Sequence, residues 1–116
     1  MDGSQDRVDK PWGYYTDIFR SDEVVFKNIT VRPGEEISYQ RHHKRSEFWY
    51  VLKGTGLFRW NNVKGWKVRP GFTIEIKKND SHQIINTGEE DMVIYEMQFG
   101  QCMEDDITRI EDKYER

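Results

Sequence analysis

The stretch GEEISYQRHHKRSEFWYVLKG, residues 34–54, contains the pattern that decides the predicted fold. Gln40 and His42 are two residues apart, so on a β-strand their side chains point to the same face. After a short polar turn, Glu47 stands at the start of the aromatic and β-branched run Phe48–Leu52, which favours a second strand. If the two strands pair, these three polar side chains enter one shared space.

The segments on both sides of this stretch have the same β character. Short runs rich in β-branched and aromatic residues alternate with Gly, Pro and Asn turn signals such as Arg69-Pro70-Gly71. This spacing predicts an all-β, single-domain sandwich or barrel. The further predicted strands are Val25–Val31, Leu57–Trp60, Trp66–Val68, Thr73–Ile76, His82–Asn86 and Met92–Phe99.

The two ends of the chain differ from this pattern. Residues 1–9 are polar and are expected to form a flexible segment before a domain that covers residues 10–116. Lys10–Tyr15 is aromatic and turn-like and should dock on the domain. Residues 104–114 have apolar residues at helical spacing, with acidic residues early and a lysine late, which predicts a short C-terminal helix.

The composition indicates a folded domain with an unusual share of polar residues. Of the 116 residues, 35% are hydrophobic and 34% are charged, and the mean hydropathy is −0.94. Disordered chains are usually poor in aromatics and strongly charged, whereas this chain has 14% aromatics and a net charge of −3. The core must therefore be small and rich in large side chains.

Several classes of protein are disfavoured by the same numbers. The longest apolar run is Phe48–Leu52, far short of the ~20 residues of a membrane span, and no secretory signal opens the chain. Cys102 is the only cysteine, so an internal disulfide is impossible and a reducing, cytoplasmic location is expected. A pI near 5.6 argues against partners such as nucleic acid or an anionic membrane.

A metal site is the first functional hypothesis. His82 begins a later predicted strand, from which it could join Gln40, His42 and Glu47 across a barrel. Two imidazoles, one carboxylate and one amide oxygen suit a divalent ion, and spacing alone leaves zinc, iron, cobalt, nickel and manganese open. The competing interpretation treats each of these side chains as an ordinary surface or hydrogen-bonded residue.

Two segments resemble the motifs of the cupin superfamily. Residues 34–54 resemble the first cupin motif, with Gln40 in place of its first histidine. Residues 71–86, GFTIEIKKNDSHQIIN, resemble the second motif, with His82 and Asn86 in register. The resemblance implies a jelly-roll β-barrel.

Three further segments narrow the resemblance. Lys10–Tyr15, residues 40–49 and residues 104–114 are similar to the type II mannose-6-phosphate isomerase (phosphomannose isomerase) cupin, found also at the C-terminus of bifunctional mannose-1-phosphate guanylyltransferases. Glutamine in place of the first motif histidine is typical of that group. The chain departs from the group at Phe48, where a second histidine is common, and at Met103, where a glycine is usual.

The resemblance implies an activity and a set of metal ligands. The implied reaction is the aldose–ketose isomerisation of mannose 6-phosphate to fructose 6-phosphate, so the implied partner is a sugar phosphate. The implied cofactor is one divalent metal ion, for which zinc is the first candidate. Gln40, His42, Glu47 and His82 match the metal-ligand positions. A homodimer is also expected, because small cupins commonly pair by their strands.

Two charged residues are candidates for catalysis. Lys27 shares strand parity with Val25 and Ile29, which predicts an inward side chain, and a buried lysine is costly unless it meets an anion. The alternative is a twisted strand from which Lys27 reaches the mouth of the barrel. Glu96 is a candidate base if its side chain points inward. One face of the last predicted strand must look into the barrel, and the opposite face, which carries a tyrosine, is the alternative to the face of Glu96.

The candidate substrate-binding residues come from three places. Lys44 and Arg45 lie in the turn beside the metal set, where they could contact a phosphate. Gln98 lies two residues after Glu96, so both side chains point to the same face of the predicted strand. Arg109 lies in the C-terminal tail, which either covers the mouth of the barrel or only packs the predicted helix.

Two alternatives to the isomerase stay open at this point. One is a non-catalytic cupin that binds a sugar phosphate or sugar nucleotide. The other is a different metal-cupin enzyme, such as a nucleotide-sugar ketoisomerase or an oxygenase.

Overall fold

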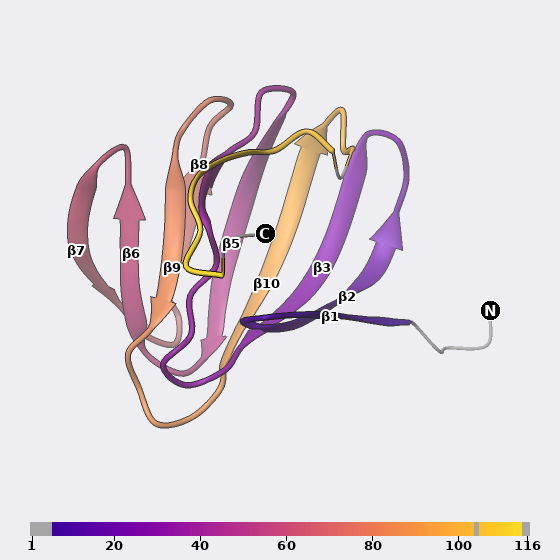
Figure 1. The fold of residues 1–116 in the computed structure, drawn as a ribbon. Coiled ribbons are helices and arrows are strands. Elements are labelled where there is room, and N and C mark those ends of the chain that lie inside the picture. Colours follow the sequence, from indigo (N-terminus) through magenta and orange to yellow (C-terminus); the bar gives the residue numbers. More distant parts are fainter. Residues whose placement is uncertain (1–5, 104, 115–116) are drawn as a thin grey trace.

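The chain folds as two antiparallel β-sheets that pack face to face (Figure 1). The computed structural model describes residues 6–103 and 105–114, without the side chain of Lys64. This part of the chain contains strands and no helix. The strands are β1 Arg7–Lys10, β2 Gly13–Arg20, β3 Val24–Val31, β4 Tyr39–Arg41, β5 Arg45–Lys53, β6 Gly56–Trp60, β7 Val63–Val68, β8 Thr73–Ile76, β9 His82–Asn86, β10 Met92–Gly100 and β11 Thr108–Glu111.

Strands distant in the sequence are neighbours in both sheets. The first sheet has the order β1-β2-β3-β10-β5-β8, and the second has the order β11-β4-β9-β6-β7. Strand β10 thus lies between β3 and β5, to each of which it pairs antiparallel. This arrangement confirms the all-β jelly-roll prediction.

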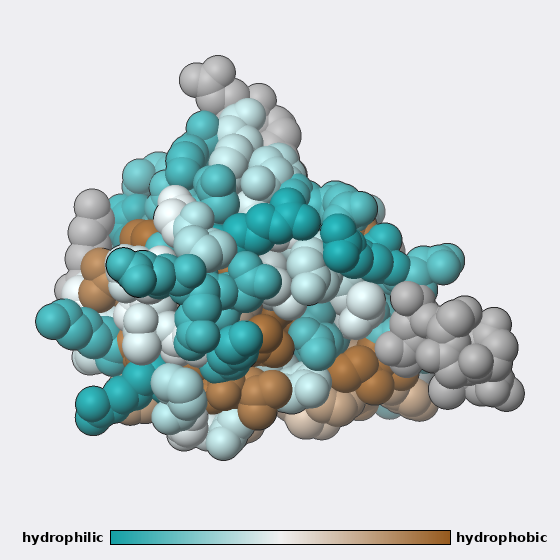
Figure 2. Space-filling model, turned by 90° about the horizontal axis from the view of Figure 1, so that it is seen from below, coloured by the Kyte–Doolittle hydropathy of each residue, from teal (hydrophilic) through white to brown (hydrophobic). Residues whose placement is uncertain are grey.

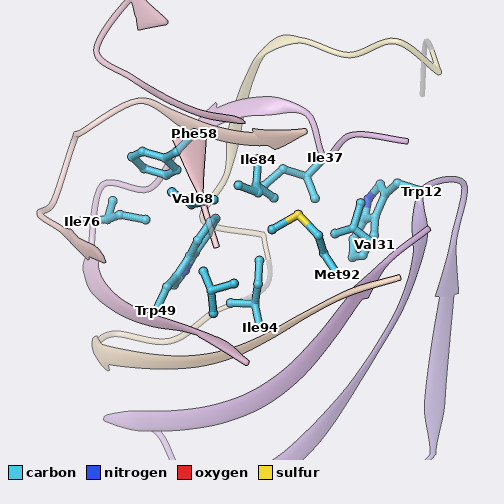
Figure 3. Packing of buried hydrophobic residues seen from close by; sticks show 11 residues of the cluster. Trp12, Val31, Ile37, Trp49, Phe58, Val68, Ile76, Ile84, Met92 and Ile94 are labelled. Atoms are coloured by element: carbon cyan, nitrogen blue, oxygen red, sulfur yellow. The ribbon is translucent and has the colours of Figure 1, made fainter. Parts of the chain in front are cut away.

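The core forms between the inward faces of the two sheets. Along β5 the residues alternate, so that Trp49 and Val51 are buried while Tyr50 and Leu52 are exposed. Figure 3 shows Trp49 pointing from the first sheet toward the second, where its ring meets the edge of Phe58 at 5.8 Å between centroids. The buried cluster comprises Trp12, Val31, Ile37, Trp49, Val51, Phe58, Val68, Ile76, Ile84, Met92 and Ile94.

Polar side chains occupy the other end of the same interior. Strand register places Gln98 of β10 opposite Glu47 of β5, and Glu96 of β10 opposite Lys27 of β3. All four side chains point inward and are at most 4% exposed. The interior is therefore apolar at one end and charged at the other.

The predicted C-terminal helix is wrong. Residues 108–111 form strand β11, which pairs with β4 through Thr108↔Arg41 and Arg109↔Gln40. An isolated helix of this length is marginal in water, whereas the unpaired edge of β4 offers a ladder of backbone hydrogen bonds. The tail crosses in front of the space between the sheets (Figure 1).

The first described residues also differ from the expectation. Arg7, Val8 and Asp9, expected in a flexible segment, belong to β1 and form a hairpin with β2. The Arg7 guanidinium lies 4.0 Å from the Tyr14 ring centroid and pairs with Asp9 at 2.9 Å. Residues 1–5 of that predicted segment lie outside the described part of the chain.

Two further features complete the fold. Gly54 follows β5 with φ of +84°, and a Cβ there would lie 2.8 Å from the Asp91 carbonyl oxygen, so this position favours glycine.

Among the described residues, no helix is long and apolar enough to span a membrane.

Candidate metal centre and substrate cavity

Glu47 is the centre of a buried group of potential metal ligands. It is the inward residue at the start of β5 and is 2% exposed. One carboxylate oxygen, Oε2, lies 3.3 Å from His42 Nε2, and the other, Oε1, lies 3.5 Å from His82 Nε2. These side chains come from the β4–β5 turn, from β5 and from the start of β9, so the two sheets together assemble the group.

Backbone carbonyl groups orient both imidazoles. His42 Nδ1 lies 2.5 Å from the Asp106 carbonyl oxygen, and His82 Nδ1 lies 3.1 Å from the Asp80 carbonyl oxygen. Because a carbonyl oxygen only accepts, each Nδ1 carries the proton and each Nε2 presents a lone pair toward Glu47. Hydrogen bonding of this kind behind a histidine is typical of metal centres.

The donor geometry fits a divalent metal ion. Bonds of about 2.1 Å in a tetrahedral site place neighbouring donor atoms about 3.4 Å apart, and the two histidine–carboxylate distances are 3.3 and 3.5 Å. His82 Nε2 is fully buried and makes no hydrogen bond to any described residue. A buried lone pair without a donor is unfavourable, and a bound cation removes that cost.

Gln40 can supply a fourth ligand after a change of its amide orientation. Its Nε2 lies 3.5 Å from His42 Nε2, and its Oε1 accepts a hydrogen bond of 2.7 Å from Ser38 Oγ. A rotation of the amide by half a turn directs the oxygen to the group, and the two orientations differ only in hydrogen bonding. Gln40 therefore lies beside the group, with His42, Glu47 and His82 as its centre.

Arg45 lies against this group. It is the first residue of β5, is 6% exposed, and donates from Nε to Glu47 Oε2 at 2.9 Å. A second guanidinium nitrogen lies 3.2 Å from His42 Nε2. The guanidinium thus neutralises the carboxylate and contacts one lone pair that a metal would use. We expect it to compete with a bound cation.

Both buried histidines are neutral near pH 7. Burial, the largest cause, and the charge of Arg45 together lower the pKa of His42 to about 4. Burial likewise lowers the pKa of His82 to about 4. Neutral imidazoles are the form that binds metal ions.

Glu96 is connected to Glu47 through Trp49. The indole Nε1 donates to Glu47 Oε1 at 3.1 Å and to Glu96 Oε1 at 2.9 Å. Gln98 Nε2 donates to the other Glu96 oxygen at 3.0 Å. Burial first, and then the charge of Glu47, raise the pKa of Glu96 to about 7, while Lys27 opposes the rise. Glu96 can therefore both accept and donate a proton near neutral pH.

A cavity of about 200 Å³ opens from this group between the sheets. Its wall contains Glu96 and the basic side chains of Lys10, Lys27, Arg45 and Arg109. The Lys27 ammonium lies 4.2 Å from the Tyr15 ring centroid. Arg45 already compensates Glu47, so the positive charge that favours an anionic ligand in this space comes from Lys10, Lys27 and Arg109.

Most candidate residues from the sequence lie in this region. The inward faces bring together Lys27, Gln40, His42, Arg45, Glu47, His82, Glu96 and Gln98. Arg109 reaches the cavity from β11, whereas Lys44 is exposed on the turn and lies outside the cavity wall. For Glu96, the inward face of β10 is the one that carries Met92 and Ile94.

Three contributors were missed from the sequence. Trp49 shares the strand parity of Glu47, which could have indicated its role as a hydrogen-bond donor. Lys10 lies in the segment that was expected to dock on the domain. Nothing in the sequence could have indicated the Asp106 carbonyl group, because this backbone oxygen reaches His42 only when the tail takes its folded course.

An all-β jelly roll that holds a buried histidine–glutamate–histidine group between its sheets is a cupin. Residues 3–112 match the family described as mannose-6-phosphate isomerase C-terminal, and the chain belongs to this family.

Curated relatives support the assignment. The alginate biosynthesis protein AlgA of Pseudomonas aeruginosa is 36% identical over 94% of this chain, and the mannose-1-phosphate guanylyltransferase ManC of Salmonella typhimurium is 37% identical over 94%. In both cases the match covers 23% of the relative, so the chain spans about a quarter of the length of these proteins.

Solved structures share the fold. The capsular polysaccharide assembling protein CapF from Staphylococcus aureus superposes with a TM-score of 0.76 at 19% identity, over 94% of this chain and 35% of that one. A double-stranded β-helix protein from Klebsiella pneumoniae superposes with a TM-score of 0.74 at 17% identity, over 97% of this chain and 89% of that one.

Proposed function

We propose that the domain is a metal-dependent sugar-phosphate isomerase that interconverts an aldose and a ketose, with mannose 6-phosphate and fructose 6-phosphate as the substrate pair. The observation that carries the proposal is the position of Glu96, whose pKa is raised to about 7, between the histidine–glutamate–histidine group and a cavity with basic walls. The family description and the relatives' names, which refer to mannose phosphates, support this substrate class. Cys102, a single free thiol, fits a cytoplasmic setting.

The metal ligands would be His42, Glu47 and His82, with Gln40 beside them. A bound divalent ion, zinc first among the candidates, would act as a Lewis acid on the sugar carbonyl oxygen.

Proton transfer is assigned to Glu96. Isomerisation moves a proton between C2 and C1, and a single carboxyl group with a pKa near 7 can accept it at one carbon and return it at the other. Trp49 and Gln98 hold the carboxyl group in place by donating to its two oxygens. Lys27, opposite Glu96 in the strand register, supplies positive charge for the oxygen on which negative charge develops.

The phosphate is assigned to the basic residues of the cavity wall. Lys10 and Arg109 approach the cavity from β1 and from β11, two elements at opposite ends of the sequence. Charge-assisted hydrogen bonds from such side chains bind phosphate strongly. Gln98 and Arg45 lie deeper, against Glu96 and Glu47, so we assign them to holding these carboxylates.

A coupled assay for fructose 6-phosphate formed from mannose 6-phosphate tests the proposal. Metal-loaded protein should turn over, and Glu96→Gln should lower the rate at least about 100-fold because the proton carrier is lost. The control Glu89→Gln changes an exposed acid outside the cavity and should leave the rate unchanged. No turnover by metal-loaded wild type beside an active reference isomerase would reject the isomerase assignment.

A non-catalytic sugar-phosphate-binding cupin is the second candidate. It is favoured by the contacts of Arg45 with both His42 and Glu47, because a guanidinium in that position can stabilise the group without a metal. This alternative predicts saturable binding of mannose 6-phosphate, measured by calorimetry, with no conversion. Binding without turnover supports it, and turnover excludes it.

A further inference from the structure

A second cavity lies on the outer side of the second sheet. Its volume is about 380 Å³, against about 200 Å³ for the cavity between the sheets. On β9, His82 and Ile84 point into the barrel. The alternate residues Gln83 and Ile85 therefore point outward, and both line this second cavity. We call it the outer cavity.

The floor of the outer cavity is amphipathic. Strand register pairs Leu57 of β6 with Ile85 of β9. Two residues further along the same strands, it pairs Arg59 with Gln83. An apolar patch thus lies beside a polar one on the same surface. On the side of β7 the wall contains Gly65, where a Cβ would meet no atom within 4 Å, so open space remains there.

The tail encloses the outer cavity on the opposite side. The lining residues of the tail and of the segment before β4 are Glu36, Glu111, Asp112 and Lys113. Arg59 donates to Glu111 Oε2 at 2.9 Å, so the floor and the tail are joined. The Arg59 guanidinium also lies 3.7 Å from the Tyr39 ring centroid, and its side chain is 12% exposed. Hydrophilic side chains cover most of the surface in Figure 2, so it is this enclosure that distinguishes the outer cavity from ordinary polar surface.

Gln83 provides an unused hydrogen-bond acceptor in the wall of the outer cavity. Its amide nitrogen donates to the Ile37 carbonyl oxygen at 3.0 Å and to Glu36 Oε2 at 3.3 Å. Because carbonyl and carboxylate oxygens only accept, these contacts fix the orientation of the amide. No described residue donates to the amide oxygen Oε1, although Gln83 is only 6% exposed. A ligand hydroxyl can supply that donor.

The charges of the outer cavity are already compensated by one another. Arg59 pairs with Glu111, and Lys113 pairs with Glu35 at 3.0 Å. An anionic ligand would in addition meet three carboxylates in the wall, unlike in the cavity between the sheets. A metal ion is not favoured either, because among the described residues only the histidine–glutamate–histidine group is close enough to hold one. The remaining binding capacity is that of hydrogen bonds and apolar contact.

We propose that the outer cavity binds an uncharged hexopyranose. A pyranose ring has a face of C–H groups that suits Leu57 and Ile85, and a rim of hydroxyls that both donate and accept. Gln83 Oε1 and the carboxylates accept from these hydroxyls, and the Lys113 ammonium donates to them. The volume lies in the range of small-molecule sites, about 300 to 1,000 Å³. The second sheet separates this ligand from the metal ligands, so its binding does not depend on the isomerase activity.

Titration of the full chain with methyl α-D-mannopyranoside and methyl α-D-glucopyranoside, followed by amide NMR spectra, tests the proposal. At least one glycoside should give saturable shifts at Leu57, Gly65 and Ile85, with a dissociation constant in the millimolar range. Gln83→Leu removes the unused acceptor and should weaken binding about fivefold. Leu57→Trp fills the cavity from its floor and should abolish the shifts.

Two matched controls make the same changes outside the outer cavity. Gln101→Leu and Leu52→Trp replace exposed residues of the same types and should leave glycoside binding unchanged. Thermal unfolding verifies that each variant folds. If Leu57→Trp does not fold, Gln83→Leu still carries the test.

Four results would overturn the proposal. The first is the absence of saturable shifts with both glycosides. The second is a set of shifts confined to the surroundings of Lys27 and Glu96, which would place the sugar in the cavity between the sheets. The third is unchanged binding in folded Gln83→Leu. The fourth is mannose 6-phosphate that shifts Leu57 and Gly65 at lower concentrations than the glycosides do, which would define an anion site.

Discussion

At the scale of single residues, the chemistry is concentrated around one carboxylate. Glu47 receives hydrogen bonds from Arg45 and Trp49, and the Nε2 atoms of His42 and His82 lie within 3.5 Å of it. A buried carboxylate is stable only when its charge is compensated, so Arg45 fulfils that role when no metal is bound. The arginine and a metal ion are therefore alternative counter-charges for the same group.

Replacing Arg45 should strengthen metal binding. Arg45→Met removes the guanidinium that contacts Glu47 and His42, so a cation no longer has to displace it. We expect zinc affinity to rise about tenfold, which corresponds to about 1.4 kcal/mol, in a competition titration with a chromophoric chelator. Lys44→Met, which changes the exposed neighbouring residue, is the control and should leave the affinity as it is. An affinity in Arg45→Met that is equal to or below wild type contradicts competition.

The raised pKa of Glu96 predicts a pH-dependent stability in the metal-free protein. Its folded pKa is about 7, above the ordinary 4.5, so between these values the folded state holds a proton that the unfolded state has lost. This contribution is complete below pH 4.5 and disappears as the pH rises through 7.

Glu96→Gln removes this dependence. The free energy of unfolding of the variant, relative to wild type, should increase by roughly 3 kcal/mol as the pH rises from 4.5 to 7. Glu96 raises the pKa of both buried histidines, so its loss lowers these values further below about 4, and both imidazoles stay neutral over most of this pH range in both proteins. Urea unfolding of both proteins at several pH values measures this difference in the free energy of unfolding. A difference that does not change with pH would show that Glu96 is ionised throughout the range.

At the scale of elements, the tail determines the shape of the cavity. Strand β11 completes the second sheet, and the Asp106 carbonyl group just before it orients His42. The end of the tail is held by Glu35, which accepts hydrogen bonds from Tyr114 Oη at 2.7 Å and Lys113 Nζ at 3.0 Å. These two hydrogen bonds lower the pKa of the Glu35 carboxyl group. Burial, followed by the hydrogen bond to Glu35, raises the pKa of the Tyr114 hydroxyl to about 12.

Loss of the Tyr114 hydroxyl should loosen β11. Tyr114→Phe removes the hydrogen bond to Glu35 and should lower the free energy of unfolding by about 1 kcal/mol. Amide hydrogen exchange over Thr108–Glu111 should accelerate, while exchange in β10 stays slow. Tyr50→Phe, in which an exposed tyrosine loses its hydroxyl, is the control. Unchanged exchange in β11 would mean that strand pairing alone holds the tail.

At the scale of the whole molecule, the low hydrophobic content has a partial explanation. Charged and amide side chains line one end of the interior, where a sealed core would contain aliphatic residues, and the apolar cluster fills the other end. Large apolar side chains also cover the outside of the first sheet. Both features reduce the apolar area that a single chain buries, so the domain should gain stability from its ligands.

Metal binding should stabilise the fold through the buried ligands. At a free metal concentration of 100 times the dissociation constant, zinc should add about 2.7 kcal/mol to the free energy of unfolding, seen as a raised melting temperature. His82→Gln removes a central ligand and should abolish the shift, whereas His43→Gln, at an exposed histidine beside the group, should retain it. An equal shift in both variants would show that the metal binds elsewhere.

The sequence alone allowed most of the strands to be predicted, and it placed Gln40 and His42 on one face. Alternation with period two depends only on local backbone geometry, so it is visible in one stretch of chain. The inward face of β10 could not be chosen in this way. Both of its faces carry apolar residues, and only pairing with β3 and β5 decides that Glu96 points inward.

The tertiary structure decided the remaining features, because they depend on contacts between distant segments. Residues 104–114 have a helical pattern, yet the open edge of β4 makes Thr108–Glu111 a strand. Arg45 belongs to a turn by sequence, yet it is buried against Glu47. Local propensity is worth tenths of a kcal/mol per residue, and backbone pairing or compensation of a buried charge outweighs it. The candidate ligands were therefore identifiable from the sequence, and their competing arginine and surrounding cavity were not.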